Sequence, residues 1–410
     1  MKKYSCIVLI LLLGGIAFAM PATATGLSSL VPKTAKSMGM GGAFRVFSTG
    51  YDTFFGNPAG YATEKGSLTI ADLATWAYFK PTQENIGKVQ DIIDGSATQS
   101  EIITSVADWV VNNGLGAGAS LGLGWAGKGF GLGLTVVTDE IASGPSYLSA
   151  SLKSQTQANA IAGVAFPISL GPVNFRIGAD ARAFYRLDSY DNGSDEWPFS
   201  DIATALITNE ADDAETLIRE LYVNGGYGFA FDAGATVGIG PLSIGAMVRD
   251  YGLEFGMGQA QVGTLIDSVT VPMDGTTPYF MSPTVSAGAA LQFNFANVVA
   301  PSIYAEIDDV VGVIDGGVET AWNSLHAGAE LKLLNFIALR AGLNKGWVSL
   351  GAGLDLFIFE VDAALFTEEL GALPGDNGRT GIAILAGYCI MHALGGGLER
   401  RTAFPPARCL

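Results

Sequence analysis

Strict alternation of apolar and polar residues is the clearest pattern in this chain. Residues 347–356 place Val, Leu and Ala on one face and Ser, Gly and Asp on the other. This period of two is that of a β-strand with one apolar face and one polar or very small face. The segments 325–332, 337–343 and 359–366 repeat it. Because the connections have only a few residues, the pattern predicts four antiparallel neighbours in a meander.

The contrast between the two faces indicates the solvent. A soluble β-sandwich also alternates, but here one face is almost unbroken in its apolar character and the other carries Gly and scattered charges. A barrel with lipid outside and a polar interior has this pattern. The chain is 49% apolar with a mean hydropathy of +0.34. After residue 20 it has no apolar run long enough for a spanning helix. Dispersed hydropathy of this kind favours a membrane barrel.

The same pattern, extended over the chain, predicts an all-β protein with an even number of antiparallel strands, as single-chain bacterial barrels have. We place fourteen strands near 67–79, 115–125, 129–139, 155–168, 172–187, 225–239, 241–252, 282–294, 300–308, 323–333, 336–344, 347–356, 358–367 and 379–390. The predicted barrel domain is therefore 67–390.

The two ends of the chain differ from the barrel. Two lysines, an apolar stretch and small residues make 1–24 a predicted secretory signal peptide. Residues 391–410 contain Glu399-Arg400-Arg401 and Pro405-Pro406 and have no visible period. We expect an irregular tail there, and our hypothesis is that 389–410 is a non-native extension or a disordered tail.

The segment 25–66 is rich in Gly, Met and Phe and has no sustained period. Gly41 and Gly42 permit backbone conformations closed to other residues, and Asn57-Pro58 signals a turn or a helix start. An apolar segment without regular structure is poorly suited to water. We therefore expect it to be buried as a plug in the barrel lumen.

These features resemble a known family. Met38-Gly-Met-Gly-Gly-Ala-Phe44 followed by Phe55-Gly-Asn-Pro-Ala-Gly60 resembles the N-terminal hatch of the FadL-type long-chain fatty acid transporters. The segments 326–330 and 339–343 are similar to C-terminal strands of that superfamily, which also contains PorV-like outer-membrane proteins. The resemblance implies a 14-stranded outer-membrane barrel with an N-terminal hatch, and a hydrophobic ligand that Phe44, Phe54 and Phe55 help to bind.

Two insertions, 84–113 and 201–221, place apolar residues at helical spacing among acidic ones. Each predicts one or two amphipathic helices. Long barrel loops face outward, so we expect both insertions outside the cell. They either cover the barrel mouth or form a groove that collects a greasy ligand. A third long stretch, 254–281, is expected to extend its two strands outward.

Charged residues on the predicted inner face have two interpretations. Charges on the lipid face are costly, so Arg176, Arg182 and Arg340 are placed inward by the parity of their strands. Such groups usually pair with neighbouring carboxylates and hold plug to wall. Alternatively, one or two of these three arginines bind the carboxylate head group of a ligand through charge-assisted hydrogen bonds.

Other chemistry finds little support. A GxGxxG at 122–127 and a GxSxG at 118–122 both lie in strand patterns without the helix that either motif requires. Two histidines and three cysteines give no metal spacing. A net charge of −17 argues against nucleic acid. We expect no enzyme activity, no metal and no cofactor.

The sequence thus predicts an outer-membrane transporter for passive uptake of hydrophobic molecules, foremost long-chain fatty acids. Its expected partners are such ligands, outer-membrane lipid and, during biogenesis, the barrel-assembly machinery. Three alternatives stay open: a PorV-like scaffold or shuttle for secreted partners, a general diffusion pore, and an adhesin that uses the two large loops.

Overall fold

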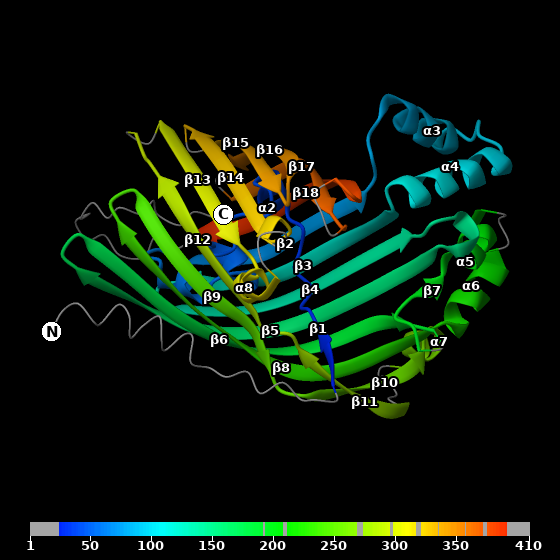
Figure 1. Ribbon diagram of the computed structural model, residues 1–410, viewed down its shortest axis with the longest axis horizontal. Helices are drawn as coiled ribbons and strands as arrows, with labels where there is room; N and C mark the ends of the chain where they lie inside the picture. The colour runs from blue at the N-terminus through cyan, green and yellow to red at the C-terminus, as the bar shows by residue number, and fades with distance from the viewer. Residues whose placement is uncertain are drawn as a thin grey trace.

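A closed antiparallel barrel forms most of the protein (Figure 1). The computed structural model describes residues 24–191, 193–207, 211–268, 274–295, 298–316, 321–334, 336–356, 358–371 and 375–391. Its barrel strands are β2 (Ser67–Tyr78), β3 (Leu115–Gly127), β4 (Phe130–Ser143), β5 (Ser151–Leu170), β6 (Val173–Tyr190), β8 (Tyr222–Ile239), β9 (Leu242–Gly252), β12 (Thr284–Gln292), β13 (Val299–Ile307), β14 (Leu325–Leu333), β15 (Ile337–Asn344), β16 (Trp347–Leu356), β17 (Phe359–Glu369) and β18 (Gly378–Met391).

Each barrel strand pairs antiparallel with the next, and β18 closes the ring on β2. Among the described residues this ring has fourteen strands, and each lies at a position that the alternation predicts. The fold class is therefore confirmed. Four short strands stand outside the ring: β1 (Thr25–Leu27), β7 (Trp197–Pro198), β10 (Phe255–Gln261) and β11 (Asp274–Met281). Of these, β1 pairs in parallel with β11, which the aperiodic sequence there did not suggest.

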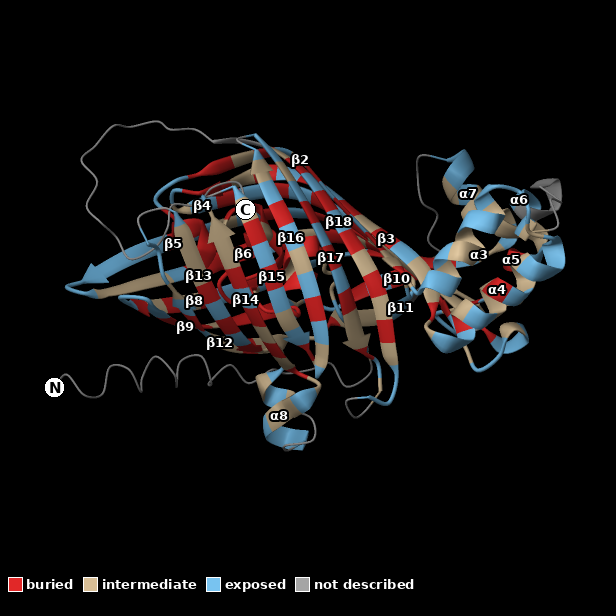
Figure 2. Ribbon diagram, turned by 90° about the horizontal axis from the view of Figure 1, so that it is seen from above, coloured by how far each residue is buried: buried red, intermediate tan, exposed pale blue. Residues whose placement is uncertain are grey.

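Burial follows the predicted alternation. Figure 2 shows buried and exposed residues alternating along β14 to β17. On β16, Leu350 is 57% exposed whereas the neighbouring Ser349 is 1% exposed. Further exposed apolar residues lie on strands around the barrel, among them Leu132, Leu134, Ile244, Ile303, Leu339 and Val361. Water would not favour so large an apolar outer surface, whereas lipid would.

We predict that Leu350→Arg weakens the inserted barrel by about 2–4 kcal/mol, the cost of a guanidinium near the middle of the lipid face. Urea unfolding in lipid vesicles measures this free energy. Leu350→Phe is the control, because it enlarges the same side chain without charging it. Equal stability of the two variants would show that this face does not meet lipid.

The two ends of the barrel differ in their connections. At one end the turns are short, such as residues 128–129 and 240–241. At the other end lie helices α3 (Gln83–Ile93), α4 (Gln99–Asn112), α5 (Phe199–Ile207), α6 (Ala211–Glu220) and α7 (Val262–Asp267), which form a lobe in both views (Figures 1 and 2). Helix α8 (Val310–Gly316) stands apart from this lobe. We call the end of the barrel that carries the lobe the helical end. The predicted helical insertions are thus present.

Within the described residues, no helix combines the length and the hydrophobicity needed to cross a membrane.

The stretch 254–281 differs from its prediction. It does contain two paired strands, β10 and β11, but α7 interrupts them, and β10 also pairs with the end of β8. Near the end of β9, Asp250 has a φ of 63° in the left-handed region and lies at a break in the β8–β9 register. The two strands therefore form a hairpin that joins the wall through β8.

Residues 28–66 run through the barrel lumen, and we call them the plug. They contain helix α2 (Ala35–Gly39) and the 3-10 helices η1 (Gly50–Phe55) and η2 (Pro58–Ala62). Helix α2 packs against β15 to β18, whereas η2 packs against β3 to β6 and β8. The plug thus touches opposite parts of the wall.

The predicted signal peptide and C-terminal tail fall almost entirely on residues 1–23 and 392–410, which lie outside the described residues. Strand β18 carries the backbone pairing with β2 through Met391. The backbone of residues 389–391 therefore belongs to the barrel wall.

Candidate functional site

Glycines on the inner face of the wall provide seats for the plug. A methyl group added at Gly178 would lie 2.4 Å from the Pro58 carbonyl oxygen, and one at Gly342 would lie 2.2 Å from the Met40 carbonyl carbon. Real Cβ atoms do not approach backbone so closely. The glycines that alternate with apolar residues in the sequence therefore include positions where the plug meets the wall.

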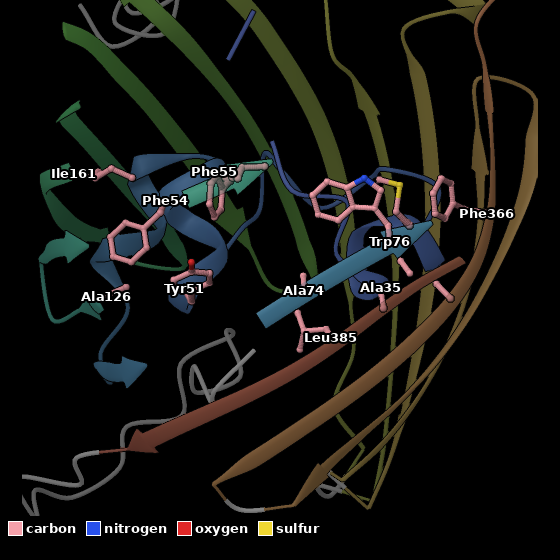
Figure 3. Packing of buried hydrophobic residues seen from close by; sticks show 14 of the residues in the cluster. Ala35, Tyr51, Phe54, Phe55, Ala74, Trp76, Ala126, Ile161, Phe366 and Leu385 are labelled. Carbon is pink, nitrogen blue, oxygen red and sulfur yellow. The ribbon is translucent and has the colours of Figure 1, made fainter. Parts of the chain in front are cut away.

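Aromatic residues fill the space between the plug and strands β2 to β5. Tyr51 and Phe54 meet edge to face with centroids 5.5 Å apart, and Phe54 lies 5.9 Å from Tyr61. Phe54 sits over Gly133 of the wall, and Trp76 of β2 belongs to the same cluster (Figure 3). Edge-to-face geometry adds to the gain from burial. This cluster, which we call the aromatic cluster, makes the lumen wall apolar here.

Asn57 and Pro58 form the joint of the plug. The Asn57 side-chain amide donates to the Val46 carbonyl at 3.0 Å, and its oxygen accepts from the Ala59 amide at 2.9 Å, which caps η2. Pro58 occupies the first turn of η2, where no hydrogen-bonding N–H is needed. The predicted helix-start signal is thus a cap that also ties two parts of the plug together.

Asn57→Ala is expected to lower the free energy of unfolding by about 1–3 kcal/mol, because buried backbone groups lose their partners. The loss of stability is measured by the temperature at which the band on a gel changes from the mobility of the folded barrel to that of the unfolded chain. Asn85→Ala is the control, since the Asn85 side-chain amide also donates to a backbone carbonyl, that of Lys80, but does so at the exposed start of α3. If Asn57→Ala and Asn85→Ala both unfold at the same temperature as the parent, Asn57 does not hold the two parts of the plug together.

Two of the predicted arginines are held in buried ion pairs. Arg182 on β6 bonds to Asp250, with Asp232 3.7 Å away. Arg340 on β15 lies 2.8 Å from Glu330 and 2.9 Å from Asp362. Both side chains are almost fully buried. This arrangement favours the interpretation that these arginines brace the wall.

Arg249 shows how such a brace reaches the plug. Its guanidinium donates to the Phe55 carbonyl oxygen, and it faces Asp232 at 3.7 Å. Arg176 is different: it is half-buried on β6 opposite Thr236, towards the short-turn end. The structure therefore does not bring Arg176, Arg182 and Arg340 into one binding site.

The structure brings together another pair of cations that the sequence analysis missed. Lys33 Nζ lies 2.5 and 2.6 Å from the two carboxylate oxygens of Glu368, and Arg379 donates to the same carboxylate at 3.0 Å. Both cations also face the ring of Tyr78, at 4.9 Å for Lys33 and 4.0 Å for Arg379. Two cations thus share one carboxylate over an aromatic face. We call these four residues the cation pair site.

The cation pair site lies at the helical end of the lumen. Tyr78 ends β2, Glu368 lies near the end of β17 and Arg379 begins β18. All three positions adjoin the loops that carry α3 and α4 or connect β17 to β18. The three charged side chains are 10–17% exposed. The site is therefore largely shielded from solvent.

The remaining predicted residues lie on the other side of the plug. Phe44 packs edge to face on Tyr304 of β13, with centroids 5.5 Å apart. Gly41 and Gly42 have φ of 68° and 82°, which other residues rarely adopt. Gly41 lies directly against the backbone of Leu343. Phe44 is thus separate from the aromatic cluster that contains Phe54 and Phe55.

Comparison with known proteins finds similarity in structure only. No family model and no curated protein sequence matches the chain. Among solved structures, the toluene transporter TodX of Pseudomonas putida is 12% identical, with 89% of this chain and 99% of that chain covered and a TM-score of 0.45. The CymD monoaromatic hydrocarbon channel is 14% identical, with 88% and 98% covered and a TM-score of 0.46. A FadL homologue of Pseudomonas aeruginosa is 13% identical, with 89% and 99% covered and a TM-score of 0.39.

These similarities extend over nearly the whole of this chain and concern the fold alone.

Proposed function

We propose that this protein is an outer-membrane transporter that takes up hydrophobic molecules passively and that its preferred ligands are long-chain fatty acids. The observation that carries the proposal is the aromatic cluster, an apolar region within a lumen that also holds buried ion pairs. A hydrophilic pore needs a polar, water-filled interior. Here the aromatic cluster of plug and wall occupies that space, with Tyr51, Phe54 and Phe55 all buried.

The cation pair site supports a carboxylate head group. Charge-assisted hydrogen bonds from Arg and Lys are among the stronger contacts available to a carboxylate. Glu368 already occupies this position as an internal carboxylate. The carboxylate of a fatty acid would replace that of Glu368 as the partner of Lys33 and Arg379. The hydrocarbon chain of the fatty acid would then lie along apolar wall residues.

Apolar side chains lead from the lobe towards this site. Ile141 of β4 packs against the aromatic cluster, and its Cδ1 and the Arg379 stem both lie near Gly114. Above them, Val110, Ala142 and Phe199 form a smaller apolar cluster between the lobe and the wall. A ligand that collects on the lobe would therefore keep apolar contacts until it reaches the cation pair site.

Onward passage requires the plug or the break in β9 to move. The described residues of the plug fill the lumen between opposite walls. No cofactor and no covalent chemistry is needed for such passage. The driving force is the gradient of the ligand, in keeping with a barrel that passively equilibrates its two sides.

Uptake of radiolabelled oleate by a diderm host that lacks its own fatty acid transporter tests the proposal. Cells that produce this barrel should accumulate oleate faster than cells with an empty vector. They should not gain permeability to a hydrophilic trisaccharide. Trisaccharide uptake without oleate uptake would favour the diffusion pore, and neither uptake would favour the scaffold or the adhesin.

A further inference from the structure

We propose that residues 41–48 form a latch within the plug and that Glu306 of β13 holds this latch closed. The remainder of the plug, residues 50–62, stays on the wall when the latch opens. This inference concerns the plug itself and holds for any ligand, so it goes beyond the proposed function.

Glu306 binds three successive backbone amides of the plug. Its Oε1 accepts from the Phe44 N–H at 2.8 Å, and its Oε2 accepts from the N–H groups of Arg45 and Val46 at 3.0 and 3.3 Å. The side chain is only 1% exposed. Consecutive N–H groups that converge in this way form a concave anion site, and here the wall supplies the anion. One side chain therefore supplies the partner of three buried donors at once.

The backbone of the latch is strained and hinged. Phe44 has a φ of 108°, a region that residues with a Cβ rarely adopt. Such conformations persist only where surrounding contacts impose them. Left-handed glycines lie at its two ends: Gly41 and Gly42 begin the latch, and Gly50 follows it. The closed latch thus holds strain between two flexible joints.

The latch and the rest of the plug pack on different walls. Val46 and Phe44 belong to a small cluster with Met247 of β9 and Tyr304 of β13. Residues of η1 and η2 belong instead to the larger aromatic cluster on β2 to β5. The two clusters share no residue, so the latch can leave its wall without breaking the aromatic cluster, once the hydrogen bonds from Asn57 to Val46 and Ser48 have broken.

A second contact supports the closed position at the rim. Arg45 Nη1 lies 3.0 Å from Asp308, and His326 lies 3.2 Å from the same carboxylate while its Nδ1 lies 2.7 Å from the Gly41 carbonyl oxygen. Burial alone would raise the pKa of Asp308, but Arg45 and His326 outweigh burial and hold it below its ordinary value. Asp308 therefore stays ionised at neutral pH and helps to hold Arg45.

Hydrogen exchange on the full-length barrel with Glu306→Gln tests the latch. Glutamine keeps the size of the side chain but replaces one acceptor oxygen with a donor that faces a backbone N–H. We expect the amides of residues 43–48 to exchange at least about tenfold faster, while those of 59–62 keep the parent rate. Asp362→Asn is the matched control, because that buried carboxylate pairs with Arg340 of the wall and not with the plug.

Conductance in planar bilayers gives a second readout. Glu306→Gln should open more often than the parent. A disulfide between Val46→Cys and Gly245→Cys, whose sites adjoin, should abolish the extra openings until it is reduced. The Glu306→Gln variant and the stapled variant are both made in a chain in which Cys389 and Cys409 are replaced by serine. If Glu306→Gln does not fold, the variant with only Val46→Cys and Gly245→Cys is measured instead. Its channel should open more often once the disulfide has been reduced.

Three results would overturn the latch: parent-like protection of residues 43–48 in Glu306→Gln, faster exchange of 43–62 as one unit, or the same change in Asp362→Asn. Unchanged openings on reduction of the staple would also overturn it. None of these results depends on a bound fatty acid, so the latch and the proposed ligand fail independently.

Discussion

Gly178→Ala is expected to displace the plug and to turn a closed barrel into a leaking one. The added methyl group would lie 2.4 Å from the Pro58 carbonyl oxygen and 2.5 Å from its carbon. Both atoms belong to the backbone, so no flexible side chain can yield. Overpacking of this kind costs typically about 1–3 kcal/mol. We expect spontaneous ion conductance in planar bilayers and faster protease cleavage within residues 50–62.

Gly387→Ala is the control for this prediction. Gly387 also lies in a barrel strand and is buried, but its added methyl group would find ordinary contacts at 3.7–3.8 Å from Glu360, Asp72 and Leu385. This variant should remain closed. If Gly178→Ala stays as silent as Gly387→Ala, the plug does not rest on β6 as described.

Changes at the cation pair site are expected to shift fatty acid affinity in opposite directions. Glu368→Gln removes the internal carboxylate and frees Lys33 and Arg379 for the ligand, so the Kd for oleate should fall. Replacement of Lys33, Arg379 and Glu368 together by methionine leaves no unpaired charge. It should raise the Kd about 10- to 100-fold, the equivalent of one charge-assisted hydrogen bond or slightly more.

Methyl oleate separates a head-group effect from a general one. The ester has the same chain without the charge, so its retention should be the same in the parent, in Glu368→Gln and in the triple methionine variant. Equal changes for acid and ester would assign these residues to packing. A raised Kd for oleate in Glu368→Gln would contradict the exchange of ligand for Glu368.

The wall could be predicted from the sequence because the direction of each side chain depends only on its position along its own strand. Alternation along β16 places Leu350 outside and Ser349 inside by the geometry of a strand alone. The same parity placed Arg182, Arg340 and Glu306 inside, where they are buried. The strand count followed from repetition of one pattern that lipid imposes on every strand.

Partners in the lumen could not be predicted in this way. Lys33 and Glu368 are 335 positions apart, and Lys33 lies in a segment without any period. Parity shows that Arg340 faces inward, but it does not show that Glu330 and Asp362 already occupy its guanidinium. The sequence predicts that Glu306 is one of several inward-facing carboxylates. Its three hydrogen bonds to backbone amides depend on where the plug runs, which the sequence does not show.

Mass spectrometry of the lipid retained by the purified barrel tests the central claim most directly. The native protein would be incubated with a mixture of fatty acids, their methyl esters and alkylbenzenes, washed in mild detergent and extracted. The account predicts stoichiometric long-chain fatty acid from the parent, more from Glu368→Gln, and little from the triple methionine variant. Retention of no apolar molecule, together with free passage of hydrophilic solutes, would contradict it.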